Sequence, residues 1–218
     1  MSWSSGKDCA YALHALRRAG TFDIAGLLTT VTAPFERVSM HGVRVGLLEL
    51  QARALGLPVH RVEIPFPCPN SVYEERMGVA VACARAAGVE VIAFGDLFLE
   101  DVRRYREERL AGTGLRPLFP LWGRPTMALA EEMIASGLKA VLVSVDPRQL
   151  EERFAGREFD LELLRELPPS VDPLGERGEF HTFAYDGPMF DRAIPWERGE
   201  LARRDGFVFQ DLRPAASR

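Results

Sequence analysis

Residues 4–9, SSGKDC, place small polar side chains, a glycine, a lysine and an aspartate within six positions. A helical pattern follows at residues 8–18, with Asp8 as the expected N-cap and Gly20 as a stop signal. The free N–H groups and the dipole at a helix start favour an anion such as phosphate. The six residues therefore predict either a phosphate-binding loop or a serine-rich helix cap, and alone they favour neither.

Three further segments gather polar side chains where loops are expected. RVSMHG at residues 37–42 follows an apolar strand. A loop at that place is expected to contact adenine or ribose, and the alternative is that its polar residues only cap the next helix. FGD at 94–96 ends another apolar strand, which favours a functional carboxylate over a cap. GERGEFHTF at 175–183 concentrates polar groups between glycines, and its alternative role is to cap a core.

The elements that must position these segments alternate between apolar strands and helices. We predict strands at residues 23–31, 58–64, 89–96 and 138–146, and helices at 8–18, 41–56, 71–88, 99–110 and 125–137. This alternation indicates an α/β fold with a parallel sheet, in which ligands bind beyond the carboxyl ends of the strands. After Asp146 the rhythm breaks into a short helix at 159–168 and an alternating strand at 206–212. We therefore divide the chain into residues 1–136 and a smaller α/β domain at 137–218.

Composition narrows the function classes. The 218 residues carry a formal net charge of −4, which argues against a nucleic-acid partner. Three cysteines without paired spacing indicate reduced thiols and a cytoplasmic protein. No apolar run of about 18 residues suggests a membrane helix, and the four histidines form no zinc motif.

The loop at residues 4–9 resembles the SGGxDS pyrophosphate loop of the N-type ATP pyrophosphatases. Residues 29–44, 93–123 and 175–190 are also similar to the diphthine–ammonia ligase family, and the similarity covers essentially the whole chain. The resemblance implies a Rossmann-like domain of the adenine-nucleotide alpha-hydrolase kind and a C-terminal acceptor domain. It also implies that ATP adenylylates a carboxylate, that ammonia attacks the adenylate, and that AMP and pyrophosphate leave. The implied acceptor is diphthine on elongation factor 2, if the source is archaeal or eukaryotic.

The resemblance and the residue types together give the expected site. A leaving pyrophosphate needs cationic and N–H stabilisation, and Mg²⁺ binds through few carboxylates and several waters. His181 is a candidate base for ammonium, ranked below an acceptor-binding role for Glu179. The expected catalytic residues are Lys7, Asp8, Asp96 and Glu179, with Asp8 and Asp96 also binding Mg²⁺. The expected ATP-binding residues are Ser4, Ser5, Gly6, Lys7, Cys9, Arg37, Ser39, His41 and Gly95. The expected acceptor-binding residues are Glu176, Gly178, Glu179, His181 and Thr182.

Two loop positions depart from the SGGxDS pattern. Ser5 replaces a glycine and adds a side chain where backbone should crowd the phosphates. Cys9 replaces a serine, and at a helix start its thiol is predicted to have a depressed pKa and to be reactive. An alkylating reagent should then inactivate the protein, and ATP with Mg²⁺ should slow the reaction. Only residues 1–3 precede the loop, where about five apolar residues are expected, which predicts a late start or a short edge anchored by Trp3.

Other functions stay open at this stage. The acceptor could be a different small molecule, or the protein could be a non-catalytic adenine-nucleotide sensor with a decayed loop. A role in tRNA modification is disfavoured by the acidic balance. A homo-oligomer is also left open, and Trp122 in PLFPLWG is interpreted as a packing residue.

Overall fold

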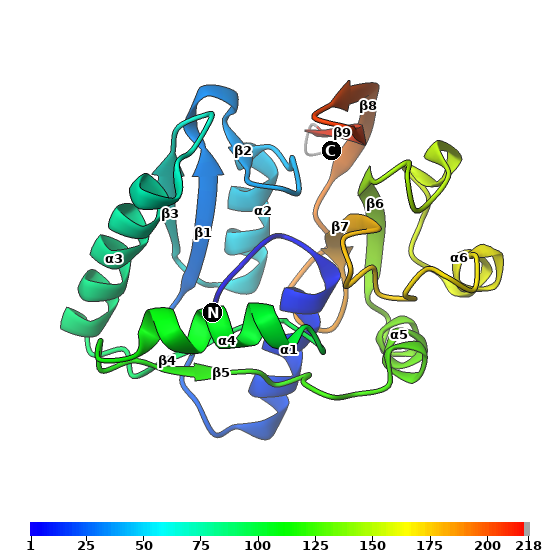
Figure 1. Ribbon diagram of the computed structural model, residues 1–218. Coiled ribbons are helices and arrows are strands. Elements are labelled where there is room, and N and C mark those ends of the chain that lie inside the picture. Colours follow the sequence, from blue (N-terminus) through cyan, green and yellow to red (C-terminus); the bar gives the residue numbers. More distant parts are fainter. Residues whose placement is uncertain (216–218) are drawn as a thin grey trace.

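The computed structural model describes residues 1–215, which form two sheet regions (Figure 1). The first region contains, in chain order, α1 (Lys7–Ala19), β1 (Leu27–Thr32), the 3₁₀ turn η1 (Ala33–Phe35), β2 (Arg37–Val38), α2 (Val45–Leu55), β3 (Val59–Ile64), α3 (Asn70–Ala86), β4 (Val91–Ala93), α4 (Glu100–Leu110) and β5 (Arg116–Leu118). The second contains α5 (Thr126–Ala135), β6 (Lys139–Val145), the 3₁₀ turn η2 (Glu152–Phe154), α6 (Leu161–Glu166), β7 (Phe180–Asp186), β8 (Trp196–Arg204) and β9 (Phe207–Pro214).

Parallel pairing organises the first region. β1 pairs in parallel with β3, β4 pairs in parallel with β5, and helices connect the strands. Residues 1–3 lie between β1 and β4, because the Trp3 N–H donates to the Leu28 carbonyl and the Ser2 N–H donates to the Ala93 carbonyl, each at 2.8 Å. The predicted mixed α/β fold with parallel strands is confirmed.

The second region is an antiparallel sheet in the order β7-β6-β9-β8. In Figure 1, α1 and α2 lie between this sheet and the parallel strands, while α5 and α6 lie on its far side. Helix α1 contacts β7, and α2 contacts β9. One buried apolar cluster runs through both regions, from Trp3 to Leu212. Among residues 1–215, no helix combines the length and hydropathy needed to cross a membrane.

Most predicted elements are confirmed, with shifted ends. All six predicted helices form, and α2 begins at Val45 rather than residue 41. Strand β1 begins at Leu27 rather than residue 23, because residues 21–26 form a loop. Strands β2, β5, β7 and β8 were not predicted. The N-cap of α1 is Gly6 and not Asp8, which lies inside the first turn.

Candidate functional site

The loop that precedes α1 is held by groups from distant parts of the chain. The Ser5 carbonyl accepts hydrogen bonds from the Ala184 N–H on β7 (2.9 Å) and from the buried side-chain amide of Gln51 on α2 (3.0 Å). The Gln51 oxygen accepts from the Trp3 indole (3.0 Å), so Trp3 is anchored as predicted. The Lys7 N–H, at the start of α1, donates to the Thr182 hydroxyl oxygen (3.1 Å). The loop is therefore fixed by both regions of the molecule.

Ser5 is strained at the position where the resemblance expects glycine. Its φ is 69°, in the left-handed region that favours glycine. Its side chain is fully buried, and within the described residues its hydroxyl has no hydrogen-bond partner. Serine at this position therefore carries backbone strain together with an unpaired hydroxyl, and crowding of phosphates by its side chain stays a prediction.

Lys7 extends away from the loop into the second region. Its ammonium group is buried, donates to Asp8 Oδ2 (2.9 Å) and to the Leu174 carbonyl (2.5 Å), and lies over the Phe159 and Phe180 rings. Burial raises the pKa of Asp8, and Lys7 opposes that rise. The second oxygen of Asp8, Oδ1, is buried without a partner in the described part of the chain. Asp8 therefore has one oxygen available for a cation or a donor.

The segment at residues 171–180 is a loop held by hydrogen bonds between its own residues, and its Leu174 carbonyl accepts the hydrogen bond from Lys7. Buried Glu179 accepts from the Asp172 N–H (2.8 Å) and from the Arg177 N–H (2.9 Å). Asp172 in turn accepts from the Leu174 N–H (3.2 Å) and the Glu176 N–H (3.1 Å). Sequence reasoning missed Asp172, which lies just outside the quoted motif. Glu179 thus shapes this loop, with both carboxylate oxygens on backbone amides.

Glu176 connects this loop to the segment after β4. Its Oε1 accepts from the Leu97 N–H at 2.8 Å. Burial raises the pKa of Glu176 to about 7, with Asp8 and Asp96 adding to the rise. Gly95 lies against the start of α1, because a Cβ there would stand 2.8 Å from the Cys9 nitrogen. Gly95 is therefore needed for close backbone packing.

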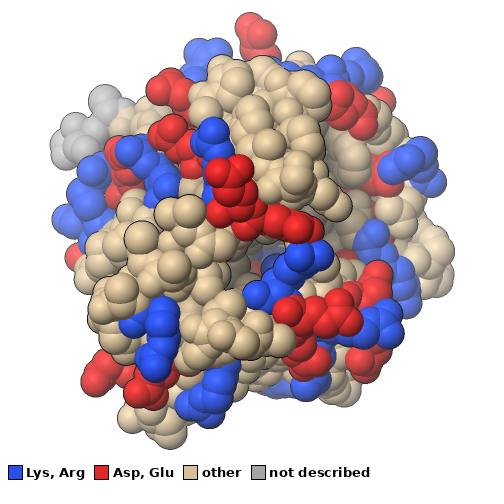
Figure 2. Space-filling view, turned by 60° about the vertical axis from the view of Figure 1, so that its left-hand side comes forward, with Lys and Arg blue, Asp and Glu red and all other residues tan. Residues whose placement is uncertain are grey.

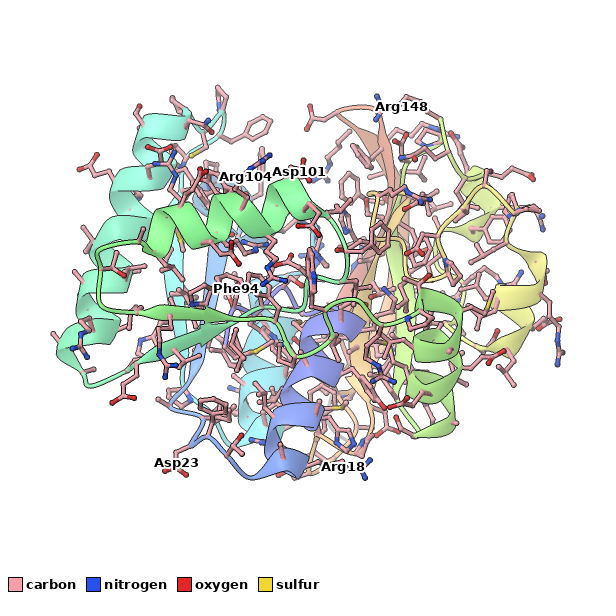
Figure 3. The ribbon with its side chains drawn as sticks, turned by 60° about the horizontal axis from the view of Figure 1, so that its bottom comes forward. Arg18, Asp23, Phe94, Asp101, Arg104 and Arg148 are labelled. Atoms are coloured by element: carbon pink, nitrogen blue, oxygen red, sulfur yellow. The ribbon has the colours of Figure 1, made fainter. Side chains whose placement is uncertain are left out.

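Asp96 is paired with an arginine that sequence reasoning missed. Arg106 on α4 donates to both Asp96 oxygens, at 2.5 and 3.0 Å, and its guanidinium lies over the Phe94 ring. Figure 3 places Phe94 inside the molecule and Asp101 and Arg104 on the outer side of α4. Arg106 could not be recognised from the sequence as the partner of Asp96, because it lies in α4 among many other charged residues. Asp96 could bind a metal only after releasing this partner.

The His41 and His181 rings lie against each other beside the loop, with centroids 4.5 Å apart and the planes tilted by 32°. Burial lowers the pKa of His181 to about 4, with a smaller contribution from nearby Lys7. Burial and His181 together hold the pKa of His41 well below its usual range. Both rings are therefore neutral near pH 7, and the predicted role of His181 as a base for ammonium is disfavoured.

Arg37 and Ser39 support the segment that carries His41. The Arg37 guanidinium donates to the Gly42 carbonyl (2.6 Å) and pairs with Asp211 on β9 (2.9 Å). The Ser39 hydroxyl is 3.1 Å from the Thr32 hydroxyl. Asp211 also pairs with Arg44 (2.8 Å), and sequence reasoning missed it. These contacts hold the segment that carries His41 in place. The positive charge of Arg37 is neutralised by Asp211 within the protein.

The predicted low pKa and high reactivity of the Cys9 thiol are wrong. Its thiol is buried, donates to the Gly6 carbonyl (3.1 Å), and burial raises its pKa to about 11. The favourable helix start does not compensate for the loss of water around the thiolate. Rapid alkylation of Cys9 is therefore not expected.

The predicted residues that converge come from the loop before α1, the segment after β4 and residues 174–182. On the face shown in Figure 2, acidic and basic side chains border a central hollow, and neither sign forms a continuous area. Among residues 1–215, no three His, Cys, Asp or Glu side chains are grouped as a metal centre. The site offers a helix start for an anion and the single free oxygen of Asp8 for a cation.

Known proteins with similar sequences match both regions. Residues 1–117 match the family model described as "Diphthamide synthase N-terminal domain", and residues 125–208 match "Diphthamide synthase C-terminal domain". The chain is 32% identical to a diphthine–ammonia ligase of Danio rerio over 163 residues, which cover 67% of this chain and 64% of the relative. It is 28% identical to that of Bos taurus and 27% identical to that of Homo sapiens, each over 180 residues that cover 74% of this chain and 66% of the relative. The chain thus spans just under two thirds of the length of these curated relatives.

Proposed function

Because the chain belongs to the diphthamide synthase family, we propose that it is an ATP-dependent ligase that forms an amide from a carboxylate and ammonia. ATP adenylylates the acceptor carboxylate, and pyrophosphate leaves. Ammonia then attacks the acyl carbon, and AMP leaves with the carboxylate oxygen that it had received. The acceptor proposed is diphthine on elongation factor 2, since the relatives carry the printed name diphthine–ammonia ligase.

The observation that carries this proposal is the meeting of the start of α1 with the loop at residues 171–180. The free N–H groups of the first turn would stabilise the leaving pyrophosphate. Lys7 lies beneath them and adds positive charge to the base of the site, while its ammonium stays on Asp8 and Leu174. In this arrangement Lys7 sets the local potential and holds the two loops together.

Magnesium would be held mainly by Asp8. Its unpartnered Oδ1 fits a cation ligand, and Mg²⁺ usually keeps several waters and needs only one or two carboxylates. Asp96 would join the ion after Arg106 moves away. Bound Mg²⁺ would neutralise charge that develops on the phosphates.

The ATP and acceptor sides are assigned by their place around α1. We assign Ser4, Ser5, Gly6, Cys9 and Gly95 to the pyrophosphate side as backbone and loop positions, with Arg37, Ser39 and His41 supporting the nucleotide side. We assign Glu176, Gly178, His181 and Thr182 to the acceptor side. Glu179, whose oxygens are both used, acts there by shaping the loop. The proposed domains are a Rossmann-like ATP-binding domain at residues 1–136 and an acceptor domain at 137–218, in a cytoplasmic protein; α5, at the end of the first range, lies beside the sheet of the second region (Figure 1).

The test is pyrophosphate release with ATP, Mg²⁺, ammonium and elongation factor 2 that carries diphthine. We expect AMP and pyrophosphate in equal amounts, and one new amide for each ATP consumed. Asp8→Asn should lower kcat by about 100-fold, because it removes the charge that binds Mg²⁺. Asp23→Asn is the matched control, since Asp23 is exposed and lies at the opposite end of α1 (Figure 3), and should leave the rate unchanged.

One observation favours a second function, a nucleotide sensor. The strain and the unpaired hydroxyl at Ser5 are what a decayed loop would contain. ATP binding without AMP formation under any acceptor would support the sensor and contradict the ligase. Pyrophosphate release with a small carboxylate, but not with elongation factor 2, would support a ligase that uses a different acceptor.

A further inference from the structure

Arg106 on α4 carries a positive charge to the segment after β4, where that segment meets the start of α1. Its Nε and Nη2 donate to the two oxygens of Asp96, at 2.5 and 3.0 Å. Its guanidinium also lies over the Phe94 ring, with Cζ 4.5 Å from the ring centroid. The third guanidinium nitrogen, Nη1, takes part in neither bond to Asp96, so Arg106 keeps donors for a further acceptor.

Asp96 lies beside the first turn of α1, where the candidate site would receive an anion. A Cβ on Gly95, the preceding residue, would stand 2.9 Å from the Asp8 carbonyl carbon, so the two backbones are in contact. The charges of Asp8 and Asp96 also add to the rise that burial causes in the pKa of Glu176, which places all three carboxylates around one point. A phosphate at this helix start would therefore meet these carboxylates and, beside them, the guanidinium of Arg106.

The pair of Arg106 and Asp96 can exchange partners more readily than Lys7, the other cation beside the start of α1. The Arg106 and Asp96 side chains are 28% and 15% exposed, and a pair in contact with water costs less to separate than a buried pair. The Lys7 side chain is only 2% exposed, and its ammonium is held by Asp8 and the Leu174 carbonyl. An arginine fork also fits phosphate oxygens as it fits a carboxylate. Arg106 is therefore the cation that can turn to a bound phosphate.

This exchange would change which groups are neutralised. When Arg106 donates to a phosphate, its charge offsets that of the phosphate, and both oxygens of Asp96 lose their partner. These oxygens then lie near Asp8 Oδ1, which is buried without a partner among residues 1–215. Mg²⁺ needs only one or two carboxylates besides waters and phosphate oxygens. The two aspartates would thus bind the ion together only after Arg106 has moved to the nucleotide.

From this geometry we propose that Arg106 is a phosphate-binding residue of the ligase, which leaves Asp96 for a phosphate of ATP when the nucleotide binds. Before ATP binds, Arg106 neutralises Asp96, and with the nucleotide it releases Asp96 for Mg²⁺. The inference rests on the proposed function, since it assumes that ATP binds at the start of α1. It adds a cation to the pyrophosphate side and couples the binding of metal to the presence of phosphate.

Two binding measurements on the full chain test the exchange. Calorimetry with inorganic pyrophosphate and with ATP, in the absence of divalent metal, measures the phosphate contact. Arg106→Gln should weaken the binding of both ligands by about tenfold or more, because a charge-assisted hydrogen bond is lost. Titration with Mn²⁺ without nucleotide, followed by electron paramagnetic resonance, measures the release of Asp96. Here Arg106→Gln should bind Mn²⁺ about tenfold more tightly than the parent, because no guanidinium competes for the carboxylate.

Two further variants separate this role from a structural one. Arg106→Lys keeps the charge and should retain most of the affinity for pyrophosphate, without tighter binding of Mn²⁺. Arg109→Gln is the matched control on the same helix, because Arg109 also pairs with a carboxylate, Glu74 (2.8 Å), and lies over an aromatic ring, Tyr105 (5.1 Å). This control should change neither measurement.

The two effects of Arg106→Gln are expected in opposite directions. Breaking an ion pair with only a structural role would weaken the binding of both pyrophosphate and Mn²⁺ or of neither, so either result would overturn the proposal. Absence of pyrophosphate binding by the parent would overturn it as well. A parent protein that binds ATP but forms no AMP with any acceptor would contradict the ligase alone, because neither binding measurement depends on turnover.

Discussion

At the carboxyl end of β4, hydrogen bonds join Thr182 to the start of α1 and Glu176 to Leu97, whereas a cavity lies between the amino ends of β1 and β4. At the carboxyl end there is no room for a larger side chain, because a Cβ on Gly95 would collide with the backbone of Asp8 and Cys9. By contrast, a Cβ on Gly78, in the middle of α3, would have nothing near it. This difference shows that the backbone is packed tightly where a ligand would bind. The same change, glycine to alanine, should therefore destabilise the protein there and stabilise it where space is open.

The largest effect should come from Gly95→Ala. Its Cβ would lie 2.8 Å from the Cys9 nitrogen and 2.9 Å from the Asp8 carbonyl carbon, so the start of α1 must shift. We expect a loss of about 3 kcal/mol in the free energy of unfolding and no measurable pyrophosphate release. Gly78→Ala in the interior of α3 is the matched control and should gain about 0.5–1 kcal/mol, because alanine favours a helix interior. Urea unfolding checks both, and equal values for the two variants would remove the contrast.

A smaller loss is expected from Gln51→Leu, which keeps the volume and removes the amide. The Ser5 and Ala184 carbonyls and the Trp3 indole would lose a buried partner. Because unpaired buried groups are costly, the free energy of unfolding should fall by about 2 kcal/mol. His60→Ala, an exposed change beside the cavity, should stay within about 0.5 kcal/mol. A neutral Gln51→Leu, measured in the same urea series, would show that the loop is held by other contacts.

The third effect depends on pH and concerns Glu176. Its pKa is about 7 in the folded protein and near 4.5 when unfolded, so the folded state binds the proton more tightly. This contribution to stability is complete below pH 4.5 and is lost as pH rises from 4.5 to 7. Glu176→Gln should therefore match the parent near pH 4.5 and exceed it by about 1 kcal/mol at pH 7.5, after allowance for partial exposure. Unfolding curves taken across this pH range check the prediction, and a Glu176→Gln variant with the parent's stability at pH 7.5 would contradict it.

The smallest effect should be a gain from Ser5→Gly. Glycine relieves the positive φ of 69° and removes the unpaired hydroxyl, although it adds freedom to the unfolded chain. We expect a gain of about 1 kcal/mol and tighter ATP binding by calorimetry. Asp205→Gly is the comparison, because Asp205 also has a positive φ, of 50°, but lies in an exposed turn. A loss of ATP binding in Ser5→Gly would show that the hydroxyl contacts the nucleotide.

The sequence predicted the elements with strong periodicity and the loops between them. Helices α1 to α6 and strands β1, β3 and β6 were predicted because apolar spacing and terminal glycines mark them. Strand β5 was missed since RPL contains proline, and β8 since WERGELARR lacks an apolar face. The sequence also identified the motif residues of the candidate site. The residues that hold these motifs in place lie outside the motifs, in other parts of the chain, and most of them were missed. Gln51 was also missed, although a polar residue on the apolar face of α2 is a signal that could have identified it.

The errors at the site have one physical cause, which is burial that the sequence does not reveal. Cys9 was predicted to be acidic from its place at a helix start, yet burial raises its pKa to about 11. His181 was predicted as a base from its ordinary pKa, yet burial lowers that value to about 4. Both errors arise because tertiary contacts bury these two side chains, and such contacts leave no local pattern in the sequence.

The buried cluster that runs from Trp3 to Leu212 has a consequence for cooperativity. Two family models match the chain in two pieces, yet the Ser5 carbonyl bonds to Ala184, and Asp211 holds Arg37 and Arg44. Heat should therefore melt both pieces in one calorimetric transition, with equal calorimetric and van't Hoff enthalpies. If either matched segment were expressed alone, its part of the shared hydrophobic core would be exposed to water. The two segments are therefore expected to fold as one unit, although each matches its own family model.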